Sequence, residues 1–127
     1  MPRTLLAILA ATALGTVIFM TTQGVVNSVP FIAWNLAPIV AMALAVPLTQ
    51  RFFFRAMWVI AAGVFVLVTL TAWAFIDHMT NESSTAALLF LFFPIYEFLM
   101  LGVTLGAAAA VHALCGRHAK AQAPSAA

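Results

Sequence analysis

Hydrophobic side chains fill four long stretches of the chain, and short polar segments separate them. The stretches cover about residues 4–22, 31–48, 56–76 and 85–114. At a rise of about 1.5 Å per residue, each is long enough to cross or nearly cross a hydrocarbon core about 30 Å thick. The pattern therefore predicts an all-α fold, in which four transmembrane helices pack as an integral membrane four-helix bundle.

The segments between these stretches contain residues that are typical of turns and loops. They cover 23–30, 50–55 and 77–84. In the last of them, the side chain of Asn81, Ser83 or Ser84 is expected to cap the fourth helix, because these residue types accept hydrogen bonds from the first free backbone amides.

The fourth stretch, 85–114, is longer than a bilayer core requires, so its helix is expected to tilt or to project into the cytoplasm. Gly116 is predicted to end this helix. The residues after it, 117–127, show no packing pattern and are predicted to form a disordered cytoplasmic tail. Residues 1–116 then form a single transmembrane domain.

Composition excludes a water-soluble fold. Hydrophobic residues make up 65% of the chain and charged residues only 6%, which leaves almost nothing to cover a surface in water. The solvent, and thus the first partner, is expected to be a lipid bilayer. The calculated pI of about 9.3 reflects a formal charge of only +2, so we expect no nucleic acid as partner.

Basic residues fall on one side of the predicted topology. They are Arg3, Arg51, Arg55, Arg117 and Lys120. Asp77 and Glu82 fall on the other side, which has no Lys or Arg. Because Lys and Arg concentrate in cytoplasmic segments, both termini are predicted to be cytoplasmic in a multi-pass protein of a bacterial inner membrane. For the first apolar stretch, the alternative to a transmembrane helix is a signal peptide cleaved near residues 11–13, although the apolar run continues well beyond that point.

Residues that could carry catalysis or bind a metal are few. Cys115 is the single cysteine, which excludes an intrachain disulfide and a thiolate metal site within one chain. His78, His112 and His118 are predicted near opposite membrane faces, too scattered to form a ligand set. The sequence also lacks a Gly-rich phosphate loop. We therefore expect no enzyme activity, no metal and no cofactor.

Small residues recur at helical spacing on several stretches. Gly102, Gly106 and Ala110 lie one turn apart, which lets another helix approach closely. At about 100° per residue, Gly106 lies about 180° from Glu97, so we interpret this strip as a face for helix packing or for contact between chains. Two further series, expected to pack against other helices, are Ala7, Ala11 and Gly15, and Ala33, Ala37, Ala41 and Ala45. In a chain so rich in alanine, such spacing also arises by chance.

One polar side chain from each stretch falls at nearly the same depth in the membrane. These side chains belong to Thr16, Asn35, Thr69 and Glu97. Their depths are about 4 to 7 Å from the helix centres, all toward the outer side. A charge at mid-membrane costs at least about 2.5 kcal/mol, so Glu97, the only acidic residue inside an apolar stretch, is expected to turn inward toward the other three and to be protonated at rest.

This polar layer suggests different roles. In the structural interpretation, Asn35 and the two threonines hydrogen-bond a neutral Glu97 and fix the register of the helices. In the functional one, Glu97 is a proton or cation site, since intramembrane carboxyl groups commonly mark ion paths. A third possibility is that Glu97 binds a polar group on another protein.

In length, number of helices and its one membrane-embedded glutamate, the chain resembles the small multidrug resistance exporters. That family's essential glutamate lies in the first helix, where this sequence has only Thr12 and Thr16, so no site residue is carried over. The sequence favours a non-enzymatic accessory, protective or interaction subunit that binds another membrane protein or forms a homo-oligomer. The alternative is a small proton- or cation-coupled transporter that acts as a homodimer with Glu97 as its coupling site.

Overall fold

Long α-helices make up nearly all of the chain that the computed structural model describes, which is residues 2–22, 29–80 and 85–123. The elements are α1 (Pro2–Thr22), α2 (Val29–Phe52), the 3₁₀ turn η1 (Phe54–Ala56), α3 (Met57–Thr80) and α4 (Thr85–Gln122). The prediction of an all-helical chain with four long apolar helices is confirmed, since each helix is long and apolar enough to cross a membrane.

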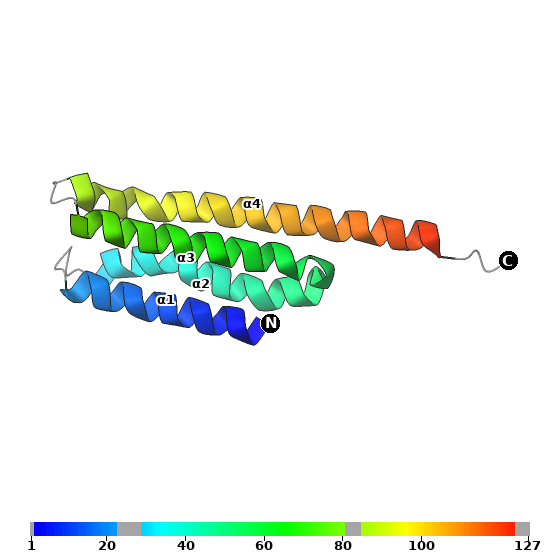
Figure 1. The fold of residues 1–127 in the computed structure, drawn as a ribbon, viewed down its shortest axis with the longest axis horizontal. Helices are drawn as coiled ribbons and strands as arrows, with labels where there is room; N and C mark the ends of the chain where they lie inside the picture. Colours follow the sequence, from blue (N-terminus) through cyan, green and yellow to red (C-terminus); the bar gives the residue numbers. More distant parts are fainter. Residues whose placement is uncertain (1, 23–28, 81–84, 124–127) are drawn as a thin grey trace.

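The helices run alternately in opposite directions, and Figure 1 shows the start of α1 and the end of α4 toward the same end of the bundle. α1 and α4 occupy opposite corners, while α2 packs against both of them and α3 packs mainly against α4. The last turns of α4 project beyond the other three helices (Figure 1). Such up-and-down packing is the simplest arrangement for helices that follow one another along the chain.

Aliphatic and methionine side chains fill the space between the helices. They include Leu5, Leu9, Ile39, Met42, Val46, Ile60, Val64, Leu67 and Leu101. Large apolar side chains also cover the outside of every helix, for example Leu14, Leu44, Phe65 and Val103. Apolar side chains thus lie on both the inner and the outer side of each long helix.

Several helices extend further than the apolar pattern predicts. Residues 50–52 form the last turn of α2 and residues 77–80 the last turn of α3, although both were predicted to lie in connections. Neither segment contains a proline or glycine that would end a helix. Residues 29–30 begin α2, and 54–55 belong to η1. The predicted connections at 23–28 and 81–84 lie outside the described residues, and so do the predicted capping residues of α4.

The end predicted for the fourth helix at Gly116 is wrong, because α4 continues to Gln122. A single glycine inside a helix costs only about 1 kcal/mol relative to alanine, and the residues that follow are mostly Ala, Lys, Arg and Gln, which favour helix. The predicted disordered tail is therefore helical in its described part, 117–122, whereas residues 124–127 lie outside the described residues.

The small-residue strip of the first helix does not pack inside the bundle. Ala7, Ala11 and Gly15 are all exposed, and a Cβ added to Gly15 would meet no atom within 4 Å. The expectation that this strip packs against another helix is wrong. Larger side chains, among them Leu5 and Leu9, form the inner face of α1.

Close approach between helices occurs instead at Gly63 of α3. A Cβ on Gly63 would lie only 2.5 Å from Cγ2 and 2.9 Å from Oγ1 of Thr104 on α4. On α2 the alanine series is divided, since Ala33 is exposed and Ala45 is buried. A spacing of four residues turns by about 40° per step around a helix, so a long series cannot keep one face.

Candidate functional site

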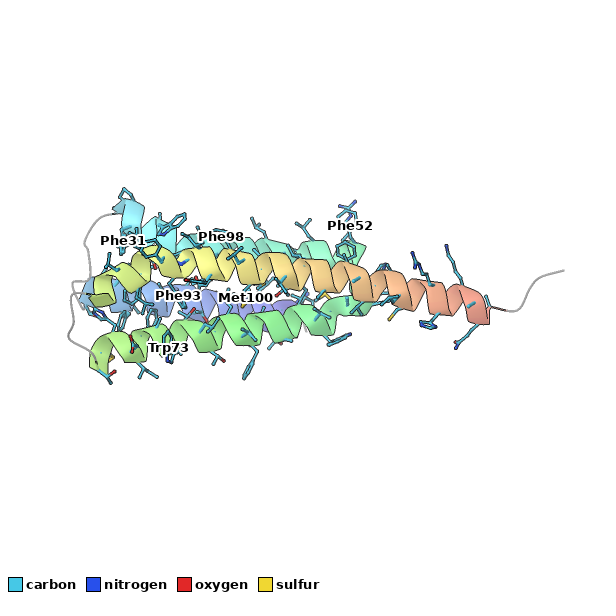
Figure 2. All side chains as sticks on the ribbon, turned by 90° about the horizontal axis from the view of Figure 1, so that it is seen from above. Phe31, Phe52, Trp73, Phe93, Phe98 and Met100 are labelled. Carbon is cyan, nitrogen blue, oxygen red and sulfur yellow. The ribbon has the colours of Figure 1, made fainter. Side chains whose placement is uncertain are left out.

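Glu97 lies on the inner side of α4, and only 2% of its surface is exposed. Phe93, one turn earlier on the same side of the helix, is buried as well. Figure 2 shows Phe93 and Met100 on the side of α4 that is turned toward α3. The carboxyl group is thus directed into the bundle, where a polar side chain needs a partner.

Thr71 of α3 is the hydrogen-bond partner of Glu97. Its Oγ1 lies 2.9 Å from Oε1 of Glu97 and 2.9 Å from the carbonyl oxygen of Leu67. A hydroxyl group has one proton, so it cannot donate to both oxygens at once. If the carboxyl group carries a proton, it donates to Thr71 while Thr71 donates to Leu67, and every contact is satisfied. The geometry therefore fits a neutral Glu97.

A small cavity adjoins this hydrogen bond. Its lining consists of Thr16, Asn35, Ile39, Thr71, Phe75, Phe90, Phe93 and Glu97. The centre of a water molecule has about 10 Å³ to move in, which is the space for about one water. The cavity is lined by at least one polar side chain from every long helix. It corresponds to the polar layer that the sequence predicts, with Thr71 in place of Thr69.

Thr16 and Asn35 line the cavity but direct their hydrogen bonds to their own helices. Thr16 Oγ1 donates to the carbonyl oxygen of Thr12 at 2.9 Å, and Asn35 Nδ2 donates to that of Phe31 at 3.0 Å. The only side chain that hydrogen-bonds Glu97 in the described part of the chain is Thr71. The layer is thus a set of locally satisfied groups around one bond between helices.

Thr69, which the sequence places in this layer, does not reach it. It is exposed on the outside of α3, and its hydroxyl donates to the carbonyl oxygen of Phe65 at 2.8 Å. Thr69 and Thr71 differ by about 3 Å in depth but by about 200° around the helix. Depth alone could not choose between them. The signal in the sequence is the four-residue series Gly63, Leu67 and Thr71, which marks the buried side of α3.

An aromatic cluster covers the cavity toward the end where α3 stops and α4 begins. The rings of Phe19 and Phe75 stack with centroids 4.2 Å apart, and the His78 ring meets Phe19 and Phe90 edge-on at 5.7 and 5.3 Å. Phe75 and Phe90 also line the cavity. The cluster joins α1, α3 and α4 and separates Glu97 from this end of the bundle.

A second hydrogen bond between helices lies next to Pro94. Proline has no backbone N–H, so the carbonyl four residues earlier, that of Phe90, loses its helical partner, and the carbonyl of Leu91 follows directly after it. The indole Nε1 of Trp34, on α2, donates to the carbonyl oxygen of Leu91 in that turn at 2.9 Å. The ring of Trp34 also packs against that of Phe98 at 6.3 Å. Nothing in the sequence pattern singled out Trp34 for this contact.

The opposite side of α4 has no neighbour in the described structure. Gly102, Gly106 and Ala110 are exposed, and a Cβ added to either glycine would meet no atom within 4 Å. Tyr96 lies on the same outer half of the helix and is 66% exposed. Its phenol hydroxyl has no hydrogen-bond partner among the residues described. The strip therefore contributes nothing to packing within this chain.

No group of three or more His, Cys, Asp or Glu side chains within residues 2–22, 29–80 and 85–123 could hold a metal ion. Cys115 is exposed. Comparison of the chain with protein-family models, with curated proteins and with solved structures gives no match. The geometry of the chain itself is thus the basis for proposing a function.

Proposed function

We propose that this chain spans a bacterial inner membrane four times, with both termini in the cytoplasm. The four long apolar helices and their apolar outer surface support insertion. Every basic residue falls near the end of the bundle that carries Pro2 and Gln122, or in the projecting part of α4. The preference of Lys and Arg for cytoplasmic segments gives the orientation.

Reporter fusions along the chain test this topology. Fusions near Gln50 and Lys120 should report a cytoplasmic location, whereas fusions near Ser28 and Asn81 should report the outer side, because only the first pair lies among the basic residues. The measurement is the activity of a reporter that is active on one side of the membrane alone. A cytoplasmic signal at Asn81 would contradict both the orientation and the four-span arrangement.

Within that membrane, we propose that the protein is a non-enzymatic interaction subunit and that it binds another membrane protein through the outer face of α4. The observation that carries this proposal is the empty space over Gly102 and Gly106. Helix association in lipid is driven largely by close packing of backbones, and glycines one turn apart permit it. Glu97 faces the other way, into the bundle, so α4 contributes one face to this chain and offers a second to a partner.

Tyr96 adds a polar group to the same outer half of α4. Its backbone lies about 1.5 Å from that of Glu97 along the helix axis, at a depth where hydrocarbon offers no hydrogen-bond acceptor. Buried tyrosine hydroxyls usually find a partner. A backbone carbonyl or polar side chain on a neighbouring helix supplies one, and lipid does not, which favours a protein as the occupant of this face.

The surroundings of Glu97 favour a structural role over transport. The cavity beside it has room for about one water, and the aromatic cluster of Phe19, Phe75 and Phe90 covers one side. A transporter needs a path for its ion to the coupling residue and a change in charge there. A neutral Glu97 bonded to Thr71 instead fixes α4 against α3.

Replacing Gly106 with leucine should prevent association with the partner, because the new side chain separates two backbones that must touch. Gly15→Leu is the matched control, since Gly15 is equally exposed and equally free of neighbours but lies on α1. A photo-crosslinking residue at Val103, beside the strip, detects contacts with a second copy or with another protein in intact membranes. Gly106→Leu should abolish the crosslink, and Gly15→Leu should leave it unchanged.

Three outcomes distinguish the possible partners and the failure of the proposal. A crosslink of twice the mass of the chain identifies a second copy, and one of another mass identifies a different membrane protein. Crosslinking that survives Gly106→Leu, or that Gly15→Leu removes to the same extent, would show that the strip is not the contact surface.

A further inference from the structure

A cavity of about 530 Å³ lies where α4 leaves the bundle and passes η1. Its lining includes Phe54, Arg55, His112, Gly116, Arg117 and Lys120. The cavity thus combines three basic side chains with aromatic rings. Its lining comes from η1 and the last turns of α4, and Figure 1 shows that α4 projects from the bundle at this end. Glu97 and the outer face of Gly102 and Gly106 have no part in it.

The positive charges of this cavity have no counterpart in its lining. The chain has three acidic residues, Asp77, Glu82 and Glu97, and none of them lines the cavity. Asp77 is in the last turn of α3, at the opposite end of that helix from Arg55. Like charges around one space repel each other, and an anion bound between them offsets that repulsion.

Aromatic contacts hold two of the donor side chains in place. The guanidinium carbon of Arg55 lies 5.4 Å from the centre of the Phe54 ring, and its Nη1 would be 3.5 Å from a Cβ on Gly116. The His112 ring lies edge-on to Phe53 and Phe54, with centroids 5.6 and 5.5 Å away. Its Nδ1 is buried and has no hydrogen-bond partner in the described part of the chain. Ordered donors of this kind suit the oxygens of a phosphate group.

An apolar groove of about 350 Å³ lies beside the basic cavity. Its lining includes Leu44, Leu48, Thr49, Phe52, Phe53 and Leu105. Leu105 and His112 are seven residues apart and therefore share one face of α4. The Phe53 ring borders the groove and contacts His112, which borders the basic cavity, so the two spaces lie on either side of this ring pair.

Thr49 contributes a buried polar group to the lining of the groove. It is only 1% exposed, and its hydroxyl has no hydrogen-bond partner in the described part of the chain. It lies one turn before Phe53, and therefore about 6 Å further from the basic end. In a phospholipid, the ester carbonyls lie between the phosphate and the acyl chains, and they are acceptors of the kind that Thr49 lacks.

We propose that the basic cavity binds the phosphate group of an anionic ligand, and that this ligand is a phospholipid whose acyl chain lies in the groove beside Phe53. Basic pockets between transmembrane helices on the cytoplasmic side commonly hold anionic headgroups. The basic side chains, the Thr49 hydroxyl and the apolar groove match the order of headgroup, ester and acyl chain in such a lipid.

Binding to the full chain in neutral detergent tests this site, with short-chain phosphatidylglycerol, short-chain phosphatidylcholine and inorganic phosphate as separate probes. Native mass spectrometry measures the bound fraction. Phosphatidylglycerol should bind more tightly than phosphatidylcholine, and the double variant Arg117→Gln/Lys120→Gln should weaken its binding at least about tenfold, as expected for loss of charge-assisted hydrogen bonds. These two side chains are exposed on α4 beyond the core, so their replacement should not affect folding.

Arg3→Gln/Arg51→Gln is the matched control. It removes the same charge near the same end of the bundle, but neither residue lines the cavity, so binding should change by less than about twofold. If inorganic phosphate competes with phosphatidylglycerol and binds with equal affinity, the cavity is still a phosphate site, but the proposal that its ligand is a phospholipid is overturned. Equal weakening by both double variants, or equal binding of the two lipids, would overturn the site itself.

Discussion

Replacing Gly63 with alanine should destabilise the bundle by about 1–3 kcal/mol, the usual cost of overpacking an interior. The added Cβ would lie 2.5 Å from Cγ2 and 2.9 Å from Oγ1 of Thr104, closer than van der Waals contact allows. Thr104 cannot easily move aside, because its hydroxyl donates to the carbonyl oxygen of Met100 at 2.8 Å and its χ1 is restricted by branching. The free energy of unfolding in mixed detergent micelles is the measurement.

Two further variants show whether this contact is the cause. Adding Thr104→Ala to Gly63→Ala should recover most of the lost stability. The second change removes Cγ2 and Oγ1 of Thr104, the two atoms nearest to the new methyl group. Gly15→Ala on α1 should leave stability unchanged or raise it by up to about 1 kcal/mol, because its Cβ meets nothing and alanine favours helix. A similar loss for Gly15→Ala and Gly63→Ala would contradict a specific contact at Gly63.

Replacing Glu97 with lysine should destabilise the bundle by at least about 2.5 kcal/mol, the lower estimate for a charge in the middle of a membrane helix. The cavity has room for about one water, and its lining offers no other acidic group. Glu97→Gln should leave the free energy of unfolding nearly unchanged, because the new amide donates to Thr71 while Thr71 donates to the carbonyl oxygen of Leu67. Unfolding in mixed micelles compares the two variants with the parent.

The bond itself is tested by a matched pair of threonines on α3. Thr71→Val should lower stability by about 0.6 kcal/mol, the average for hydrogen bonds between membrane helices, and by no more than about 1.7 kcal/mol, the largest value. Thr69→Val makes the same chemical change on the exposed side of the helix and should have little effect. Equal effects at the two positions would show that the Thr71 contact contributes nothing of its own.

Proton flux into liposomes separates the structural role of Glu97 from transport. We expect no flux in the parent, or flux that Glu97→Gln leaves undiminished, because the neutral amide preserves the hydrogen bond with Thr71. Flux in the parent that disappears in Glu97→Gln at unchanged stability would assign Glu97 to ion coupling, since a transport cycle requires the charge to change.

The candidate site was predictable in depth but not in direction. Counting residues from helix centres placed Thr16, Asn35 and Glu97 at one height, and all three line the same cavity. The same count selected Thr69 in place of Thr71, because 3 Å of depth separates them while half a turn of helix decides which one faces inward. A helix that is apolar all round gives no periodic signal for its inner face.

The pattern of small residues in the sequence also did not predict which helix faces pack together. The series at Ala7, Ala11 and Gly15 and the series at Gly102 and Gly106 look alike in the sequence, and both lie on the outside of the described bundle. Gly63, which belongs to no such series, has the tightest surroundings of the described glycines. Whether a glycine brings two helices together depends on which side chain faces it, and Thr104 comes from another helix far along the chain.

The sequence by itself determined that the chain forms four long apolar helices and that its basic residues gather at one end. Both results follow from the order of apolar and charged residues along the chain and do not depend on how the helices pack. Only the tertiary structure decided that Thr71 bonds Glu97, that Trp34 reaches Leu91, and that Arg55 joins Arg117 and Lys120 around one cavity. In a chain whose helices are apolar on every side, hydrophobicity no longer distinguishes inside from outside. The fit of side chains between helices then determines which faces meet.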